Sequence, residues 1–398
     1  LDRISFWSLF VVVVLLPVFF LPFTQIPVET SKGFLLVIGL VISFIFWIAA
    51  RFSDGKITVP KSRLLLAAFV IVVVSFISAL FSGTLGVSLF GTMLDVGTFY
   101  FILGAFLLLF LSSVILKDIK NARMVFLGII ISSLVLFVFQ SLRIFLPNVF
   151  SLGILGDKTD SIFGAWNALG LFAGFATVIS LFMLEFFYNS KRMKWVLGVL
   201  IGISIILSAT VNFSLIWGLI GIFSLIIFVY KISLSFDKKE IVIEKRNFPI
   251  LSFGIMMISL LFLISGQFVG GVLPNSLGLN NVEVRPSFSA TMAVTKDAFL
   301  ENPILGMGPN KFSAVWAMYK PAVINSTDFW DTSFSYGSGL IPTFTATTGV
   351  LGILAWVLFF VLFILAGVKA LFSSIKNNCS ASSGLLINFK CKSKRILK

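Results

Sequence analysis

The sequence has no histidine among its 398 residues and only two cysteines, Cys379 and Cys391. The absence of histidine removes the most common general base and the most common zinc ligand. The two cysteines lie near the C-terminus, at a spacing that matches no metal or redox motif. We therefore expect no metal site and no cofactor.

Charged residues are also scarce. They make up 12 % of the chain, whereas about 25 % is typical of a soluble domain. Hydrophobic residues make up 58 %, and Phe alone accounts for 47 positions, which excludes a soluble globular enzyme, a disordered chain and a disulfide scaffold. The apolar runs are continuous over about 20 residues, enough to cross roughly 30 Å of hydrocarbon, and do not alternate as barrel strands do. The expected fold class is an all-α, polytopic integral membrane protein.

Ten apolar segments are long enough to be membrane spans. They cover approximately residues 5–23, 34–50, 64–82, 98–116, 123–146, 166–187, 195–210, 212–231, 250–267 and 346–372. Nine of them form an expected membrane bundle over 1–267, and 346–372 is the tenth span. Between them, 268–345 is one long loop in which we expect short helices. Residues 373–398 form a basic tail that we expect to be disordered or to mark a truncated C-terminus.

The net charge of +14 is unevenly distributed along the chain. With the N-terminus in the cytoplasm, the inner side receives 23 of the 30 Lys and Arg residues and the outer side receives 7. The positive-inside rule therefore predicts a multi-pass protein of the cytoplasmic membrane, with both termini cytoplasmic and 268–345 outside. The basic charge then faces anionic lipid headgroups. Membrane lipids are expected partners, and nucleic acid is not.

The long outer loop contains most of the unusual residues, and long loops are often functional. Pro286 suits the first turn of a helix, and the pattern after it predicts a helix over about 287–300 that lies flat at the membrane interface. One side of this helix, directed towards lipid or protein, would carry Phe288, Met292 and Phe299.

Carboxylates in the loop are the candidate general bases. Asp297 and Glu301 are four residues apart and would share another face of that helix, which is either a solvated acidic face or one directed at substrate. Asp328 and Asp331 lie further on, among aromatic and amide residues of 325–339 that suit either sugar recognition or an ordinary folded loop.

Gly306 and Gly308 stand just before a second short helix, expected to begin near Asn310 and to carry Lys311 and Lys320. Two interpretations of the glycines stay open. Their backbone N–H groups and the helix dipole could bind phosphate beside the lysines, or a glycine could end the preceding helix as a C-cap.

Polar residues at the ends of spans are further candidates. Asp95 and Asn167 lie at the mouths of two spans, on the same expected side as the long loop. Glu185 lies near the inner end of another span, where we expect it to snorkel towards water.

Three segments resemble a known family. Arg285 to Phe312, with its Asn302-Pro303 and Gly306-x-Gly308, is similar to the signature of O-antigen ligase-like and O-antigen polymerase-like membrane proteins. Gly164 to Gly170 and Thr347 to Gly352 are also similar. In topology the likeness covers roughly 64–372.

The resemblance implies a metal-independent glycosyltransferase that transfers or polymerises a glycan linked to polyprenyl diphosphate, on the outer face of the membrane. The acceptor would be a glycan, a lipid or a protein. Arg285 matches a family arginine that holds the diphosphate, and Ser338 stands near the position of a family histidine that helps to activate the acceptor. This chain has no histidine, and Asn212 to Ser214 stand where the family has another arginine.

Together these considerations give two sets of candidate site residues. The catalytic candidates are Arg285, Asp297, Glu301 and Asp331. The substrate-binding candidates are Lys311, Lys320, Asn310, Asn167, Asp95 and Ser338. We expect Arg285 to point towards the outer mouth of the bundle near Lys311 or Lys320, the alternative being an ion pair with Glu283 or Glu301.

Two other functions stay open. The absent histidine and arginine favour a non-catalytic homologue that binds envelope glycans. A transporter or flippase is the third, although span centres contain almost no ionisable residues, which is where coupling and substrate sites usually lie.

Overall fold

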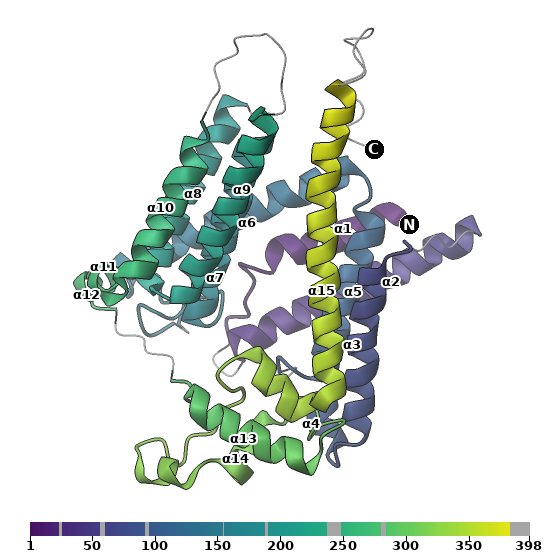
Figure 1. Cartoon of the computed structure of the whole chain (residues 1–398), viewed down its shortest axis with the longest axis vertical. Helices are drawn as coiled ribbons and strands as arrows, with labels where there is room; N and C mark the ends of the chain where they lie inside the picture. The colour runs from purple at the N-terminus through teal and green to yellow at the C-terminus, as the bar shows by residue number, and fades with distance from the viewer. Residues whose placement is uncertain are drawn as a thin grey trace. The chain divides into compact units, whose positions relative to one another are not determined.

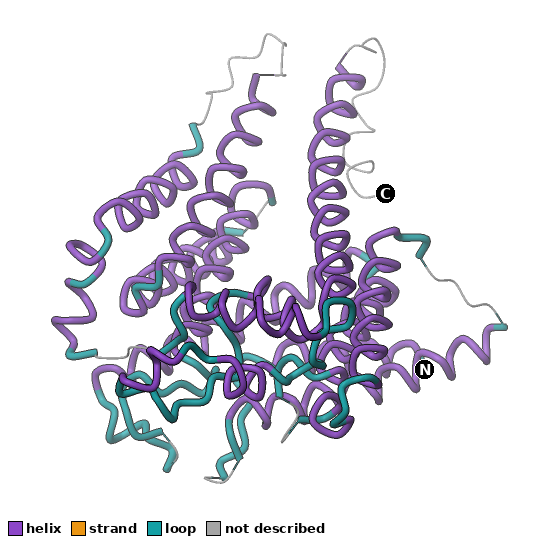
Figure 2. The backbone as a smooth tube through the Cα atoms, turned by 60° about the horizontal axis from the view of Figure 1, so that its bottom comes forward, coloured by secondary structure: helices purple, strands orange, loops and turns teal. Residues whose placement is uncertain are grey.

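The computed structural model describes residues 1–23, 26–55, 60–91, 95–153, 155–187, 190–236, 248–279 and 284–382, and over these residues its regular structure is helical, without a strand (Figures 1 and 2). The helices are α1 (Asp2–Leu15), α2 (Val28–Asp54), α3 (Arg63–Leu80), α4 (Leu85–Leu89), α5 (Phe99–Ile115), α6 (Ile119–Phe145), α7 (Trp166–Phe186), α8 (Lys191–Val211), α9 (Ser214–Phe236), α10 (Ile250–Ser265), α11 (Gln267–Gly270), α12 (Val272–Leu277), α13 (Phe288–Glu301), α14 (Phe312–Tyr319), the 3₁₀ turn η1 (Ala322–Ser326) and α15 (Leu340–Ser382). The all-α, polytopic membrane fold is confirmed.

A helix lies at each of the ten predicted spans, but not every one has spanning length. Within the described residues, seven helices are long and apolar enough to cross a membrane, or eight if α10 and the sharply bent α11–α12 segment count as one span. Two expected spans are shorter, since α1 has 14 residues and α5 has 17, against the roughly 20 that a perpendicular span needs. The short helices α11 and α12 lie at the start of the segment expected to be the long loop.

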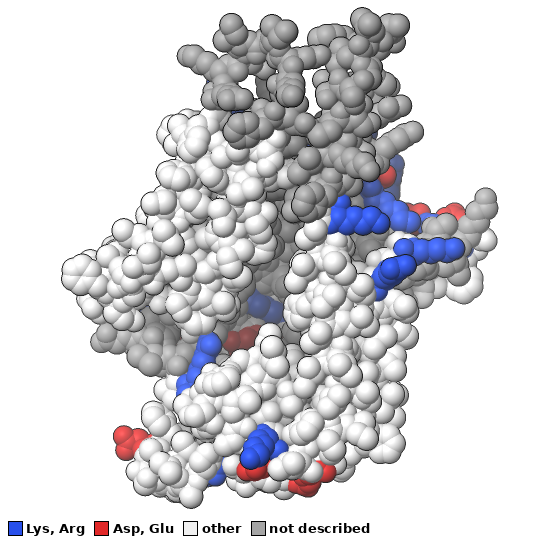
Figure 3. Space-filling model, in the orientation of Figure 1, with Lys and Arg blue, Asp and Glu red and all other residues white. Residues whose placement is uncertain are grey.

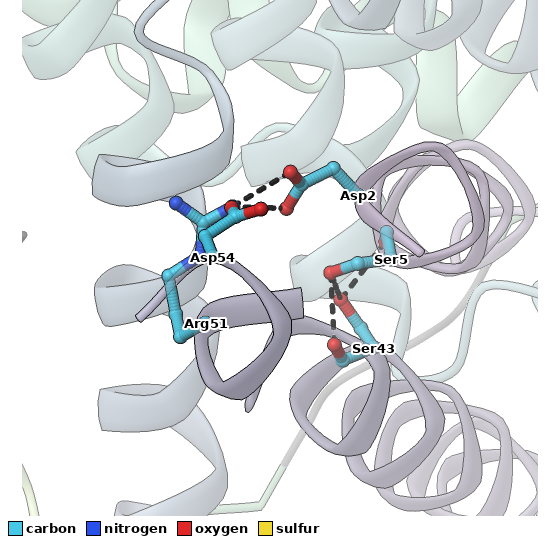
Figure 4. Close-up of polar contacts among 5 residues, drawn as sticks. All are labelled: Asp2, Ser5, Ser43, Arg51 and Asp54. Carbon is cyan, nitrogen blue, oxygen red and sulfur yellow. Dashed lines mark hydrogen bonds and ion pairs between the residues drawn. The ribbon is translucent and has the colours of Figure 1, made fainter. Parts of the chain in front are cut away.

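The chain divides into two compact units, the first comprising Leu1–Val12, Lys32–Lys117 and Glu283–Gly367. In this unit α1 and α2 lie against each other through small residues. Ser5 donates to the carbonyl of Ser43 at 2.8 Å, and Ser43 donates to that of Ser5 at 2.9 Å (Figure 4). Such close contacts between small polar residues are typical of helix pairs in membranes.

An ion pair closes one end of the α1–α2 pair. Arg51, in the last turn of α2, contacts Asp2 at the start of α1 at 2.6 Å and Asp54 at 3.2 Å (Figure 4). The cation at a helix C-terminus and the anion at a helix N-terminus each complement the helix dipole. The geometry therefore holds the two helices antiparallel.

The second unit comprises Val13–Ser31, Asp118–Val282 and Val368–Lys398, and its core is the packing of α7 against α8 and α9. Gly170 and Gly174 let α9 approach α7, because a Cβ on Gly170 would lie 2.5 Å from the Ile216 side chain and one on Gly174 would lie 3.0 Å from it. Two small residues at this spacing form a common interface between membrane helices. On the other side of α9, Trp217 stacks on Phe262 of α10 at 4.0 Å.

Glu185 does not snorkel, contrary to our expectation. Its side chain is 7 % exposed and forms an ion pair with Lys231 of α9. The pair satisfies a carboxylate that would be costly to bury alone. It also ties the ends of α7 and α9 together.

Charge is concentrated in a few places on each unit. In Figure 3 the visible surface over α10, whose sequence contains no charged residue, is uncharged, as for a lipid-facing helix. Charged side chains gather over α13, where Lys296, Asp297 and Glu301 are exposed. This distribution agrees with apolar spans and a water-facing connecting segment.

Candidate functional site

The loop between α13 and α14 is docked onto a break in α15. The break is at Gly349, whose φ of 62° and ψ of −160° interrupt the helix. Backbone hydrogen bonds join the two segments, from Met307 N to Ala346 O at 3.0 Å, from Gly308 N to Thr347 O at 2.8 Å and from Val350 N to Pro303 O at 2.9 Å. The two segments that carry most of the family resemblance are therefore in direct contact.

The glycines of this junction are required by close backbone approach. A Cβ on Gly306 would lie 2.5 Å from the Thr347 carbonyl carbon, and one on Gly349 would lie 2.5 Å from the Ile304 carbonyl oxygen. Both residues also have positive φ, which disfavours any side chain. In α3, Ser78 Oγ adds a bond to the Leu305 carbonyl at 2.7 Å.

Neither interpretation of the Gly-x-Gly segment is correct. The N–H groups of Gly306, Met307 and Gly308 donate to backbone carbonyls, so they do not form a phosphate cradle. The C-cap of α13 is Asn302, not a glycine. The glycines instead allow two chain segments to meet backbone to backbone, a role that spacing alone does not reveal.

Three of the predicted substrate-binding residues cluster beside this junction. Asn310, in the left-handed conformation with φ of 59°, donates from Nδ2 to Asp95 Oδ2 at 3.1 Å. The next residue, Lys311, donates from Nζ to the Ser82 carbonyl at the end of α3. Burial lowers the pKa of the Lys311 ammonium, because desolvation disfavours its charged form. We call Asp95, Asn310 and Lys311 the junction cluster.

Lys320 and Ser338 lie elsewhere in the same unit. Lys311 and Lys320 are the residues flanking α14, so the helix separates them, and Lys320 Nζ donates to the Trp330 carbonyl. The Ser338 backbone N–H donates to Thr291 Oγ1 of α13 at 2.9 Å. Lys311 and Lys320 each donate to a backbone carbonyl of the protein, and these two hydrogen bonds hold the α14 segment in place.

The catalytic candidates are exposed residues of this unit. Arg285 precedes α13 and is exposed, as are Asp297 and Glu301 on the helix and Asp331 beyond η1. The helix predicted over about 287–300 is present as α13, while its flat orientation at the membrane interface stays a prediction. Its N-cap is Ser287, whose Oγ accepts from Ala290 N at 3.1 Å.

The packed face of α13 differs from the apolar side that we singled out. Phe288 is 62 % exposed and Met292 is 45 % exposed, so of the two expected surroundings, lipid or protein, these side chains do not pack into protein, and their contact with lipid stays a prediction. The helix instead buries Ala290, Val294 and Ala298 against Phe312, Val315 and Trp316 of α14. Small residues form the packed face because they let α13 and α14 approach closely. Hydrophobicity alone did not indicate that this face would be the buried one.

Asn167 belongs to the second unit, in the first turn of α7, where it is half-buried. A buried arginine shapes the segment before it. Arg143, at the end of α6, is 0 % exposed. It donates to the carbonyls of Phe150, Leu155, Asp157 and Asp160.

Within the described part of the chain, no group of three or more His, Cys, Asp and Glu side chains gathers that could hold a metal ion. No protein-family model matches the chain, and no curated protein matches it.

The junction gives a first testable expectation. Gly349→Ala should lower the thermal unfolding midpoint and reduce the folded yield in detergent, because the new Cβ meets the Ile304 carbonyl at 2.5 Å in a conformation that only glycine adopts easily. The cost should be about 2 kcal/mol or more. Tryptophan fluorescence during heating measures it.

The matched control is Gly367→Ala in the same helix, where a Cβ would meet nothing within 4 Å. Alanine favours a helix interior over glycine, so this variant should be as stable as the parent or more so. Equal stability of Gly349→Ala and the parent would show that the junction is not held as described.

Proposed function

We propose that this protein is a membrane glycosyltransferase that transfers or polymerises a glycan from a polyprenyl-diphosphate carrier on the outer face of the cytoplasmic membrane. One observation carries the proposal. The Gly306-x-Gly308 loop and the Thr347 to Gly349 break, which are the two segments most similar to O-antigen ligase-like proteins, form one hydrogen-bonded junction. Such joining is expected if both belong to one site.

The chemistry requires a cation for the diphosphate and polar groups for the sugars. Arg285 is exposed at the start of α13 and offers the planar, bidentate donors that suit a phosphate group. Lys311 and Asn310 lie at the start of the adjacent α14. The exposed aromatic rings of Trp330 and Tyr336 can stack on sugar faces, while neighbouring amides and acids bind hydroxyls.

The orientation in the membrane is part of the proposal. Its basis is the excess of Lys and Arg on one side of the predicted spans. In a background lacking Cys379 and Cys391, a membrane-impermeant maleimide added to intact cells should label Ser338→Cys and spare Ser374→Cys, because the first is outside and the second is cytoplasmic.

The labelling experiment has two controls. Ser333→Cys, at an exposed position in the same segment, should also be labelled from outside. Permeabilised cells should label all three variants. Labelling of Ser374→Cys alone in intact cells would reverse the orientation and remove the outer-face reaction.

Transfer itself is tested with the purified full chain in lipid vesicles. The donor is the polyprenyl-diphosphate-linked glycan pool extracted from the native organism, and the acceptor is the matching envelope fraction. We expect glycan to appear on the acceptor, detected by its increase in mass. Transport of donor across the vesicle membrane without product would support a flippase instead.

The second candidate function is a non-catalytic protein that binds envelope glycans. The specific observation in its favour is the complete absence of histidine, since the family resemblance places one near Ser338. Donor binding without turnover, under conditions where the membrane extract itself forms product, would select this function.

A further inference from the structure

The junction cluster brings together groups that are distant in sequence. Asp95 lies just before α5, and Asn310 follows it by 215 residues, yet the Asn310 amide donates to Asp95 Oδ2 at 3.1 Å. A Cβ on Gly91 would lie 2.5 Å from that carboxylate oxygen and 2.9 Å from the amide nitrogen. The Asp95 carboxylate and the Asn310 amide therefore pack directly against the Gly91 backbone.

The surroundings of the pair are also fixed. Gly308 fits against the end of α3 so closely that a Cβ would lie 2.3 Å from Ser82 Cβ. Ser88 donates to Ser82 Oγ at 3.0 Å, and Lys311 donates to the Ser82 carbonyl. The Lys311 ammonium and the Asp95 carboxylate are thus each held in place by neighbouring residues. A general base needs to be held rigidly in this way.

The other carboxylates of this unit differ from Asp95 in their setting. Asp297, Glu301, Asp328 and Asp331 are exposed, whereas Asp95 is half-buried. A general base has to be held within hydrogen-bond reach of the proton it accepts. A carboxylate fixed by an amide and a packed backbone meets that need better than a fully solvated one.

We propose that Asp95 is the general base that activates the acceptor, and that Asn310 positions it. This inference rests on the proposed function. A carboxylate can accept about four hydrogen bonds, so the Asn310 amide leaves capacity for an acceptor hydroxyl. Asp95 takes over the role for which this chain has no histidine.

The acceptor oxygen forms a bond to C1 of the donor sugar while its proton passes to the Asp95 carboxylate. The bond from C1 to the diphosphate oxygen breaks, and polyprenyl diphosphate leaves with the electron pair. No oxidant, reductant or further reactant takes part.

An anionic nucleophile distinguishes a general base from a residue that only binds substrate or stabilises the fold. Azide carries no proton, so it can attack C1 without a base. The test uses the full chain in vesicles with the extracted lipid-linked glycan pool, and measures transfer to the hydroxyl acceptor and formation of glycosyl azide in parallel. Thermal unfolding of each variant verifies the fold.

Asp95→Asn should lower transfer to the hydroxyl acceptor by about 100-fold or more, whereas its formation of glycosyl azide should equal that of the parent. Its residual transfer should rise steadily with pH, because hydroxide replaces the missing base. Asn310→Gly, which suits the positive φ at this position, should lose part of the hydroxyl transfer and keep the azide reaction. Asp118→Asn, at an exposed position in the other unit, should behave as the parent.

Several outcomes would overturn the inference. Normal hydroxyl transfer by Asp95→Asn would remove the base, and equal loss of both reactions by folded Asp95→Asn and Asp95→Glu would make Asp95 a structural tie. If the parent forms neither product, the proposed function fails and the inference fails with it. If Arg285→Ala loses both products while Asp95→Asn forms both at the parental rate, the function stands without this role for Asp95.

Discussion

Replacing Arg143 by Met is expected to destabilise the protein by about 3 kcal/mol or more. The guanidinium is completely buried at the end of α6, and a guanidinium has five N–H donors. It donates to Asp160 O at 3.1 Å, to Phe150 O at 3.2 Å and to Leu155 O at 3.3 Å, with a further bond to Asp157 O. Methionine fills a similar volume but leaves these carbonyls without their donor.

Other hydrogen bonds in the connection between α6 and α7 depend on the same folding of its carbonyls around α6. Gln140, one turn earlier in α6, donates to the carbonyls of Lys158 and Asp160 at 3.3 Å. The Asp160 carboxylate accepts from the backbone N–H groups of Gly156 and Asp157 at 2.8 and 2.9 Å. Loss of Arg143 should therefore loosen the whole connection into α7.

The measurement is the thermal unfolding midpoint in detergent, together with proteolysis of the connection between α6 and α7. Arg192→Met, at an exposed position in the same unit, is the matched control and should leave both unchanged. Arg143→Lys should fall between, because an ammonium has three donors in a compact group. A parental midpoint for Arg143→Met would show that the carbonyls do not depend on this cation.

The second large effect is expected at Arg285. Arg285→Lys keeps the positive charge but lacks the planar fork that binds two phosphate oxygens, so glycan transfer should fall by about 100-fold. Arg285→Ala should lose more, because it also removes the charge. Initial rates with the extracted donor pool measure both variants.

Lys296→Ala tests whether any cation on this segment would serve. Lys296 is exposed on α13, 11 residues after Arg285, and its loss should leave transfer unchanged. If Arg285→Lys and Arg285→Ala both transfer glycan at the parental rate, Arg285 does not hold the diphosphate.

The fold class could be predicted from composition because a backbone in lipid can form only helices or closed barrels, and apolar runs that do not alternate exclude the barrel. Helix positions followed from the same runs, including the separate α8 and α9, where Asn212 adopts a left-handed C-cap. Length was harder, since hydropathy does not show where turns begin: the apolar run expected to span the membrane over 5–23 forms a helix that ends at Leu15.

The candidate site was only partly predictable. Residue chemistry pointed to Asp95, Asn310 and Lys311 separately, but their grouping depends on the docking of the 302–311 loop, which no local pattern encodes. The roles of Gly306 and Gly349 depend on each other, because a Cβ on either glycine would collide with the backbone nitrogen of the other.

Arg143 shows a different limit. Its place at the end of an apolar span is also typical of a snorkelling surface cation. The difference lies in the following connection, whose carbonyls turn inward around the guanidinium. Sequence gives the cation but not the direction of those carbonyls.

The most direct test of the central claim is a stoichiometric one. The purified full chain in lipid vesicles is given the extracted lipid-linked glycan pool and the acceptor fraction, and polyprenyl diphosphate release is measured alongside glycosidic bonds formed. The account predicts equal amounts of the two, rising together in time and lost together in Arg285→Ala. Donor that stays intact while bound to the folded protein would contradict it.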